Sequence, residues 1–373
     1  MVRLNQFKNL GILTIAATIF LIWVGGLVRS TGAGMGCPDW PKCFDCWVPP
    51  TDSVSLPAGY REHYIALREK KNNRVAKTLA RLGMSVTAEK ILNDPSVHED
   101  EPFNAVKTWI EYLNRVVGVL VGILIFFTTV SAWRIKNEPL GREVNASKRP
   151  TTIFWLSLLG FVGVGFEGWL GSIVVSTNLM PSFITAHMII ALLILLSLIT
   201  AVLLAQNKLN DLRGTLNSEK NINTRDELKK SMMPVYIGIA VCALVSAQII
   251  MGTQVREQVD AVAKTLGEQR RTDWIAHLTG VYNIHKYFYY FLASVIIYWF
   301  TRLRIYFNSV SGVRLLSFGL LGLFFSEVAL GISMNNFGIP SIIQPLHLLL
   351  AILVFSAAYT LTIKVQLYLK KSV

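Results

Sequence analysis

The feature that most constrains the fold is a series of apolar stretches, each about as long as a helix that crosses a lipid bilayer. Such a helix needs about 20 mostly apolar residues, because the bilayer core is roughly 30 Å thick. The sequence therefore predicts an all-α polytopic membrane protein with eight transmembrane helices. The stretches lie roughly at 9–29, 109–133, 151–175, 182–205, 233–254, 281–301, 313–334 and 342–365.

The basic residues predict how these helices are oriented. They collect at the ends of the apolar stretches, as topology signals do, so the net charge of +13 does not indicate a nucleic-acid partner. Segments 134–150, 206–232 and 302–312 and the tail at Lys370 and Lys371 are rich in them. By the positive-inside rule these segments, and both termini, are cytoplasmic.

The first apolar stretch is longer than the core of a usual signal peptide, so we expect it to be retained as a helix. No mitochondrial-type presequence precedes it, which favours a multi-pass protein of the bacterial inner membrane. Segments 30–108, 176–181, 255–280 and 335–341 are then periplasmic. Within the first of them, residues 60–92 are polar and predict one or two solvated surface helices without chemistry. His63 and His98 are interpreted as ordinary surface histidines.

One hairpin pattern occurs twice in the chain. Glu167, Leu170, Gly171 and His187 recur 160 positions later as Glu327, Leu330, Gly331 and His347, and the ends of the first and fifth stretches also match. This predicts a parallel repeat: two tandem four-helix bundles related by a pseudo-twofold axis along the membrane normal. The N-terminal bundle covers 1–206 and includes the outer segment 30–108. A cytoplasmic linker covers 207–232, and the C-terminal bundle covers 233–373.

The second half carries a pair of histidines at similar depth. His285 opens the sixth stretch and His347 the eighth, and two histidines facing each other across a bundle can hold one haem iron from both sides. A bis-histidine haem has no open position and suits electron transfer. The other interpretation is two unrelated packing histidines, and His277, in the outer segment, is a less favoured ligand.

The first half breaks this symmetry. Its equivalent positions are Asn114 and His187, and an amide is a poor iron ligand, so a haem there would be held by His187 alone. Glu111, Asn114 and Arg115 share one helix face. Glu111 could accept protons or position a reacting group, or could only pair with Arg115. The second half thus resembles a site for a permanently bound cofactor, and the first half a site for a molecule that is chemically changed. Glu167 and Glu327, near the periplasmic edge, are assigned a structural role.

Two arginines and four cysteines complete the set of candidates. Arg29 and Arg256 end the first and fifth stretches, where they could pair with haem propionates or simply extend to the interface. In the outer segment, Cys37 and Cys43 lie six positions apart, while Cys43 and Cys46 form a C-x-x-C. A disulfide is expected there, but the partner of Cys43 stays open. Cys242 is expected to be a small buried apolar residue.

These motifs resemble those of a known family. The stretch GGLVRSTGAGMGCPDWPKC (25–43), the Glu-x-x-x-Arg pattern from Glu111 to Arg115 and the two Gly…His hairpins are similar to those of haem A synthases, over essentially all eight stretches. The resemblance implies an oxidoreductase that converts the methyl group at ring position 8 of haem O to a formyl group by successive hydroxylation. It also implies a role in cytochrome oxidase assembly.

The resemblance also assigns roles to particular residues. It places haem b on His285 and His347, the substrate haem on His187 beside Asn114 and Arg115, the catalytic glutamate at Glu111, and the disulfide at Cys37 and Cys43. The chain departs from the family at Asn114, where many relatives carry histidine. Haem O synthase and membrane lipid are the expected partners, a homo-oligomer is compatible with the sequence, and the sequence identifies no electron donor.

Two other functions fit part of the pattern. The His285–His347 pair alone would suit a membrane b-type cytochrome that passes electrons, for example from quinol. A haem transporter or chaperone is the third hypothesis, but the sequence contains no motif for ATP binding and no exposed loop suited to delivering haem.

Overall fold

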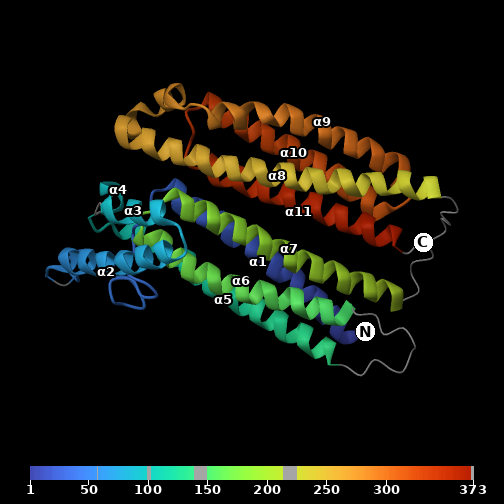
Figure 1. Ribbon diagram of the computed structural model, residues 1–373, viewed down its shortest axis with the longest axis horizontal. Helices are drawn as coiled ribbons and strands as arrows, with labels where there is room; N and C mark the ends of the chain where they lie inside the picture. Colours follow the sequence, from blue (N-terminus) through green and yellow to red (C-terminus); the bar gives the residue numbers. More distant parts are fainter. Residues whose placement is uncertain (57, 99–101, 138–148, 213–224, 371–373) are drawn as a thin grey trace.

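The computed structural model describes residues 1–56, 58–98, 102–137, 149–212 and 225–370. Apart from an isolated bridge between Cys43 and Cys46, the regular elements of this described part are helices (Figure 1). They are α1 (Val2–Ser30), α2 (Tyr60–Arg81), α3 (Ser85–Asn93), α4 (Pro95–His98), α5 (Ala105–Lys136), α6 (Arg149–Ser176), α7 (Pro181–Leu212), α8 (Arg225–Leu266), the 3-10 helix η1 (Glu268–His277), α9 (Val281–Phe307), α10 (Ser311–Asn336) and α11 (Ile343–Leu369).

Within the described residues, seven helices are long and apolar enough to cross a membrane, namely α1, α5, α6, α7, α8, α10 and α11. The chain is therefore a multi-pass membrane protein. The eighth predicted span, 281–301, does form a helix, but α9 is not one of the seven. Tyrosines at 287, 289 and 290, Lys286 and the arginines at its end lower the hydropathy of α9.

The long helices lie in two groups (Figure 1). In the first, α1, α5, α6 and α7 contact one another in a closed ring, and in the second α8, α9, α10 and α11 do the same. Between the groups, α1 contacts α11, α7 contacts α8, and α7 contacts α11. In the sequence repeat α1 corresponds to α8 and α7 to α11, so the first two contacts are equivalent. The interface is thus reciprocal, as between two copies related by a twofold axis.

Segment 255–280, predicted to be a periplasmic loop, is largely helical. Helix α8 continues to Leu266 and η1 follows it. The apolar stretch ends near residue 254, but Val259 beyond it packs with Trp274, Leu278 and Ile339 in a small core. Trp274 is only 1% exposed. This second, smaller core explains why the helix extends past the predicted boundary.

The polar helices α2 and α3 confirm the prediction of helices within 60–92, but they are not simply solvated. Ala76, Ala88 and Ile91 pack against Leu170 and Ile173, near the end of α6. Nζ of Lys71 also donates to the carbonyl oxygen of Ser172 at 2.6 Å. These helices therefore cover one end of the first group.

Part of the predicted cytoplasmic charge lies outside the described residues. This holds for residues 138–148, for residues 213–224 of the predicted linker, and for the tail beyond Lys370. The side chain of His98 also lies outside the described part.

Candidate functional site

The two histidines of the second group face each other across the ring of helices. His285 is the fifth residue of α9, and His347 is the fifth residue of α11. Their ring centroids are 6.4 Å apart and their planes meet at 84°. A metal–imidazole bond is about 2 Å long, so two imidazoles on opposite sides of one iron have centres roughly 6 Å apart. The pair thus fits the axial ligands of a haem.

Glycines on the neighbouring helices leave room for these rings. A Cβ added at Gly252 would lie 3.4 Å from Cε1 of His285, and one at Gly331 would lie 3.3 Å from Cε1 of His347. Larger residues at these positions would press on the imidazoles. The two glycines therefore let each ring lie close to the backbone of the adjacent helix.

Each hairpin histidine contacts the glutamate of its own hairpin. Nδ1 of His347 lies 3.0 Å from Oε1 of Glu327, and Nδ1 of His187 contacts Oε2 of Glu167. Both glutamates lie nine residues before the last residue of their helix, Ser176 or Asn336, which is roughly 14 Å along the axis. The sequence analysis gave them only a structural role at the membrane edge. Their recurrence 20 residues before each histidine was the signal it did not use.

The first group differs where the sequence predicted it. Asn114 stands at the position of His285, and its Oδ1 is buried with no hydrogen-bond partner in the described part of the chain. Gly25, the counterpart of Gly252, has no described atom within 4 Å of an added Cβ. An unsatisfied polar atom and open space therefore replace the imidazole of the second group.

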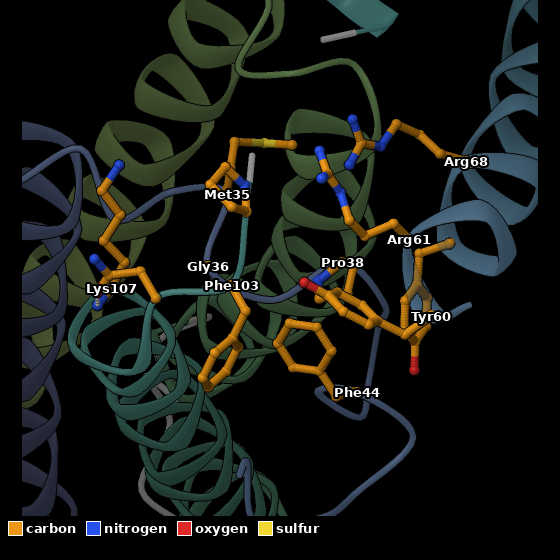
Figure 2. Close-up of a pocket in the computed structure, with 12 residues that line it drawn as sticks. Met35, Gly36, Pro38, Phe44, Tyr60, Arg61, Arg68, Phe103 and Lys107 are labelled. Atoms are coloured by element: carbon orange, nitrogen blue, oxygen red, sulfur yellow. Dashed lines mark hydrogen bonds between the residues drawn. The ribbon is translucent and has the colours of Figure 1, made fainter. Parts of the chain in front are cut away.

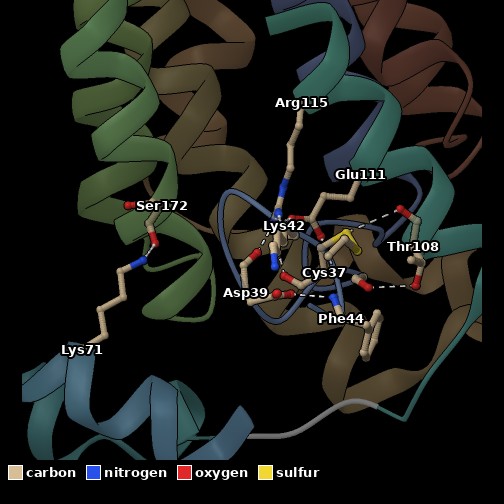
Figure 3. Close-up of polar contacts among 11 residues, drawn as sticks. Cys37, Asp39, Lys42, Phe44, Lys71, Thr108, Glu111, Arg115 and Ser172 are labelled. Atoms are coloured by element: carbon tan, nitrogen blue, oxygen red, sulfur yellow. Dashed lines mark hydrogen bonds and ion pairs between the residues drawn. A yellow bond between two sulfur atoms is a disulfide. The ribbon is translucent and has the colours of Figure 1, made fainter. Parts of the chain in front are cut away.

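Glu111 is held by the disulfide loop and by Arg115 (Figure 3). The carboxyl group is 3% exposed, Oε1 accepts from Nη2 of Arg115 at 2.6 Å, and Oε2 accepts from the main-chain N–H of Cys37 at 2.9 Å. Arg115 also donates to the carbonyl oxygens of Asp39, Lys42 and Cys37, at 2.6, 2.9 and 3.2 Å. The Glu111–Arg115 pair is therefore present, and it fixes the loop on α5.

The structure resolves the pairing of Cys43, which the spacing alone had left open. Cys37 and Cys43 form the disulfide, and Cys46 is exposed with a free thiol. Cys43 and Cys46 still exchange two main-chain hydrogen bonds, of 3.0 and 3.2 Å, so the loop folds back on itself here. Cys242, in α8, is a half-buried free thiol.

The two arginines that were considered as partners of haem propionates both pair with one aspartate. Nη2 of Arg29 lies 3.1 Å from Oδ2 of Asp260, and Nη2 of Arg256 lies 2.6 Å from Oδ1. Arg256 also donates to the carbonyl oxygen of Arg29 at 3.2 Å, which ties α8 to α1. The sequence analysis missed Asp260, although it lies four residues after Arg256, the spacing of a helical ion pair.

A pocket lies beside the disulfide loop, between α2 and the start of α5 (Figure 2). Aromatic Phe44, Tyr60 and Phe103 and basic Arg61 and Lys107 are among its lining residues. Phe44 and Phe103 meet edge to face with ring centroids 5.4 Å apart. This aromatic cluster buries the disulfide away from the solvent.

The other histidines do not join the pair in the second group. His277 is exposed at the end of η1, and its Nδ1 lies 3.0 Å from the carbonyl oxygen of Asp273. His63 is exposed on α2 and its ring contacts Tyr64, with centroids 5.2 Å apart. His63 fits its interpretation as a surface histidine, and the exposed His277 had been considered only as a less favoured ligand.

The fold and site define a multi-pass helical membrane protein whose helices hold ionisable residues in repeated pairs. The chain belongs to the COX15-CtaA family of cytochrome oxidase assembly proteins, whose family model matches residues 8–80 and 87–359. The haem A synthase of Shewanella oneidensis is 26% identical over 193 residues, which are 50% of this chain and 44% of that relative. The match thus spans less than half of the relative's length.

Proposed function

We propose that the chain is a haem A synthase, which oxidises the C8 methyl group of haem O to a formyl group by successive hydroxylation. The observation that carries the proposal is the His285–His347 pair, with ring centroids 6.4 Å apart in a chain of the COX15-CtaA family. The relative from Shewanella oneidensis, named haem A synthase, supports it.

In this proposal His285 and His347 hold haem b, which supplies one-electron transfer when bound. A haem held by two histidines would suit electron transfer rather than oxygen binding, so this half of the chain would store or pass electrons. The glycines at 252 and 331 let the two imidazoles lie close to the backbones of the neighbouring helices.

The first group holds the substrate, haem O. His187 is the single imidazole, and Asn114, with its unsatisfied Oδ1, leaves the opposite side open. Glu111 accepts protons released near the substrate. A carboxylate offers about four acceptor positions, so the hydrogen bonds from Arg115 and Cys37 leave room for a proton. Arg115 keeps Glu111 in place.

The membrane arrangement follows from the same proposal. Helix α9 is the eighth span, and the two rings of helices are tandem four-helix bundles, 1–206 for the substrate and 233–373 for haem b. Their reciprocal contacts support this division. Both termini are cytoplasmic, in a bacterial inner membrane. Arg29 and Arg256 would pair with haem propionates, and a haem O synthase would supply the substrate.

The test is to express the protein beside a haem O synthase, extract the haems and separate them by chromatography. Haem A or its hydroxylated precursor supports the proposal. Haem O left unchanged in a sample that shows a full haem b spectrum and is supplied with a reductant contradicts it. Glu111→Gln should lose turnover and keep the haem b spectrum.

A second candidate is a b-type cytochrome, favoured by the His285–His347 pair taken alone. It predicts full electron transfer from quinol in Glu111→Gln, because it needs no acid in the first group. A haem transporter or chaperone would instead release unmodified haem to an acceptor protein.

A further inference from the structure

The carboxylate–imidazole contact is built twice in this chain, at places 160 residues apart. Glu167 of α6 meets His187 of α7, and Glu327 of α10 meets His347 of α11. Four residues after each glutamate, a glycine faces the same ring: an added Cβ would lie 3.8 Å from Cε1 of His187 at Gly171. One face of α6, and likewise of α10, therefore places a carboxyl group and a glycine next to the imidazole of the following helix.

Apart from the histidine, each of these glutamates has few polar contacts among the described residues. Ionisable side chains deep in a transmembrane helix are costly, and they persist where they have a partner or a function. Oε1 of Glu167 and Oε2 of Glu327 are buried and have no hydrogen-bond partner among the described residues. The histidine is thus the contact that accounts for each glutamate.

The contact also sets which ring nitrogen is available. A carboxylate beside Nδ1 keeps the proton on that nitrogen, so Nε2 is left to bind a metal. A histidine ligand whose Nδ1–H donates to a carboxylate is held in orientation and is a more basic ligand.

We propose that Glu327 and Glu167 are positioning residues, which fix the tautomer and ring orientation of His347 and His187 and make each imidazole a more basic ligand of haem iron. This inference rests on the proposed function, because it assumes that these histidines bind haem. It assigns a role to two acids that had been given only a structural one.

The two ligands proposed for haem b are then unequal. Nδ1 of His285 is buried with no carboxylate paired to it in the described residues, and Gln248 donates to the main-chain oxygen of His285, at 2.9 Å. Of these two histidines, only His347 has a carboxylate beside its Nδ1, and that carboxylate belongs to Glu327. A negative charge and a more basic ligand stabilise ferric over ferrous iron, so Glu327 should lower the reduction potential of haem b.

The test compares Glu327→Gln with Glu167→Gln, its match in the other half, in the purified full-length protein. Glutamine keeps the size and a carbonyl acceptor but removes the negative charge. Redox titration followed by absorption should give a higher haem b potential in Glu327→Gln and an unchanged one in Glu167→Gln. With a haem O synthase co-expressed, Glu167→Gln should retain less haem O per haem b, by roughly 10-fold or more.

An unchanged potential in Glu327→Gln with full haem b content would overturn the role of Glu327, and unchanged haem O content in Glu167→Gln that of Glu167. If Glu327→Gln loses haem b, Glu327→Asp decides: retained haem with a wild-type potential supports the proposal, and loss in both variants shows a packing role only. Failure of the proposed function is distinct, since the wild-type protein would then leave haem O unconverted whatever the potentials and haem contents of the variants.

Discussion

The main-chain N–H of Cys37 donates to Oε2 of Glu111 at 2.9 Å, so the disulfide loop and the acid of α5 form one unit. Arg115 completes this unit by binding the other oxygen of Glu111 and three carbonyl oxygens of the loop. The proposed catalytic acid is therefore placed by a segment outside the membrane-spanning helices. A change in the loop should alter the position of Glu111 without altering His285 and His347, the proposed haem b ligands.

Replacing Arg115 with alanine should destabilise the protein strongly. It removes the partner of a carboxylate that is 3% exposed, and breaking a buried pair from one side costs about 3–5 kcal/mol. Thermal melting in detergent should show a clear drop. Arg115→Lys keeps the charge but not the planar fork, so it should lie between wild type and alanine. Equal melting temperatures in all three proteins would show that Arg115 does not hold the loop.

Gly36→Ala should separate the loop from α5. An added Cβ would lie 2.6 Å from the backbone carbonyl of Lys107, and the backbone there cannot give way easily. Overpacking of this kind costs about 1–3 kcal/mol. Melting temperature should fall and dithiothreitol should reduce the Cys37–Cys43 disulfide faster. Gly122→Ala is the control, because nothing described lies within 4 Å of its added Cβ. A loop that reduces at the wild-type rate in Gly36→Ala would contradict the docking.

The helices could be predicted from sequence because the length of an apolar stretch is set by the bilayer. The sequence also placed His187, His285 and His347 near the starts of their helices, where the structure has them. The end of α8 could not be predicted in this way, because Val259 extends the helix by packing on Trp274, which lies in another element. Where a helix ends outside the membrane depends on such tertiary contacts.

The partners of the site residues were harder to predict than their positions. The sequence placed Glu327 and His347 on adjacent helices, but their contact depends on how each helix is rotated about its axis. The contact of Asp260 with Arg29 could not be predicted for the same reason, since Arg29 lies on a helix far away in the sequence. The pairing of Cys37 with Cys43 was implied by resemblance, while the spacing alone also allowed Cys46.

The free thiols should be distinguishable by labelling. N-Ethylmaleimide should modify the exposed Cys46 in the folded, oxidised protein, and Cys242 only after denaturation, because Cys242 is half-buried in α8. Trypsin cleaves after Lys42, so the disulfide should hold two peptides together in non-reducing mass spectrometry. A cross-linked Cys43–Cys46 peptide, or labelled Cys37, would contradict the pairing.

Lys71 should make stability depend on pH. Burial, and then the positive charge of Arg115, lowers the pKa of Lys71 from 10.5 to about 8. Between these values the unfolded chain binds more protons than the folded chain, so the free energy of unfolding rises with pH. The cost of the charged amine is present below pH 8 and lost by about pH 10. The neutral amine still donates to Ser172.

Lys71→Met isolates this effect. The variant lacks the charge, so its melting temperature relative to wild type should be most favourable near pH 7 and should become less favourable as pH rises to 10. Thermal melts of both proteins across this range measure the difference. A difference that stays constant with pH would show that Lys71 titrates normally in the folded protein.

Asp260 should couple the two groups of helices. Its carboxylate binds Arg29 of α1 and Arg256 of α8, and both distances are within 3.1 Å. The side chain of Asp260 is 39% exposed, so solvent screens these pairs and the loss in Asp260→Asn should be only about 1 kcal/mol. Added salt should reduce the difference from wild type.

Asp273→Asn is the matched control, because in the described part of the chain Asp273 pairs with Arg270 within η1 and links no two helices. It should change the melting temperature little. If both variants melt alike, the Asp260 bridge contributes nothing to the contact between α1 and α8, and the bond from Arg256 to the backbone of Arg29 remains as a link between these helices.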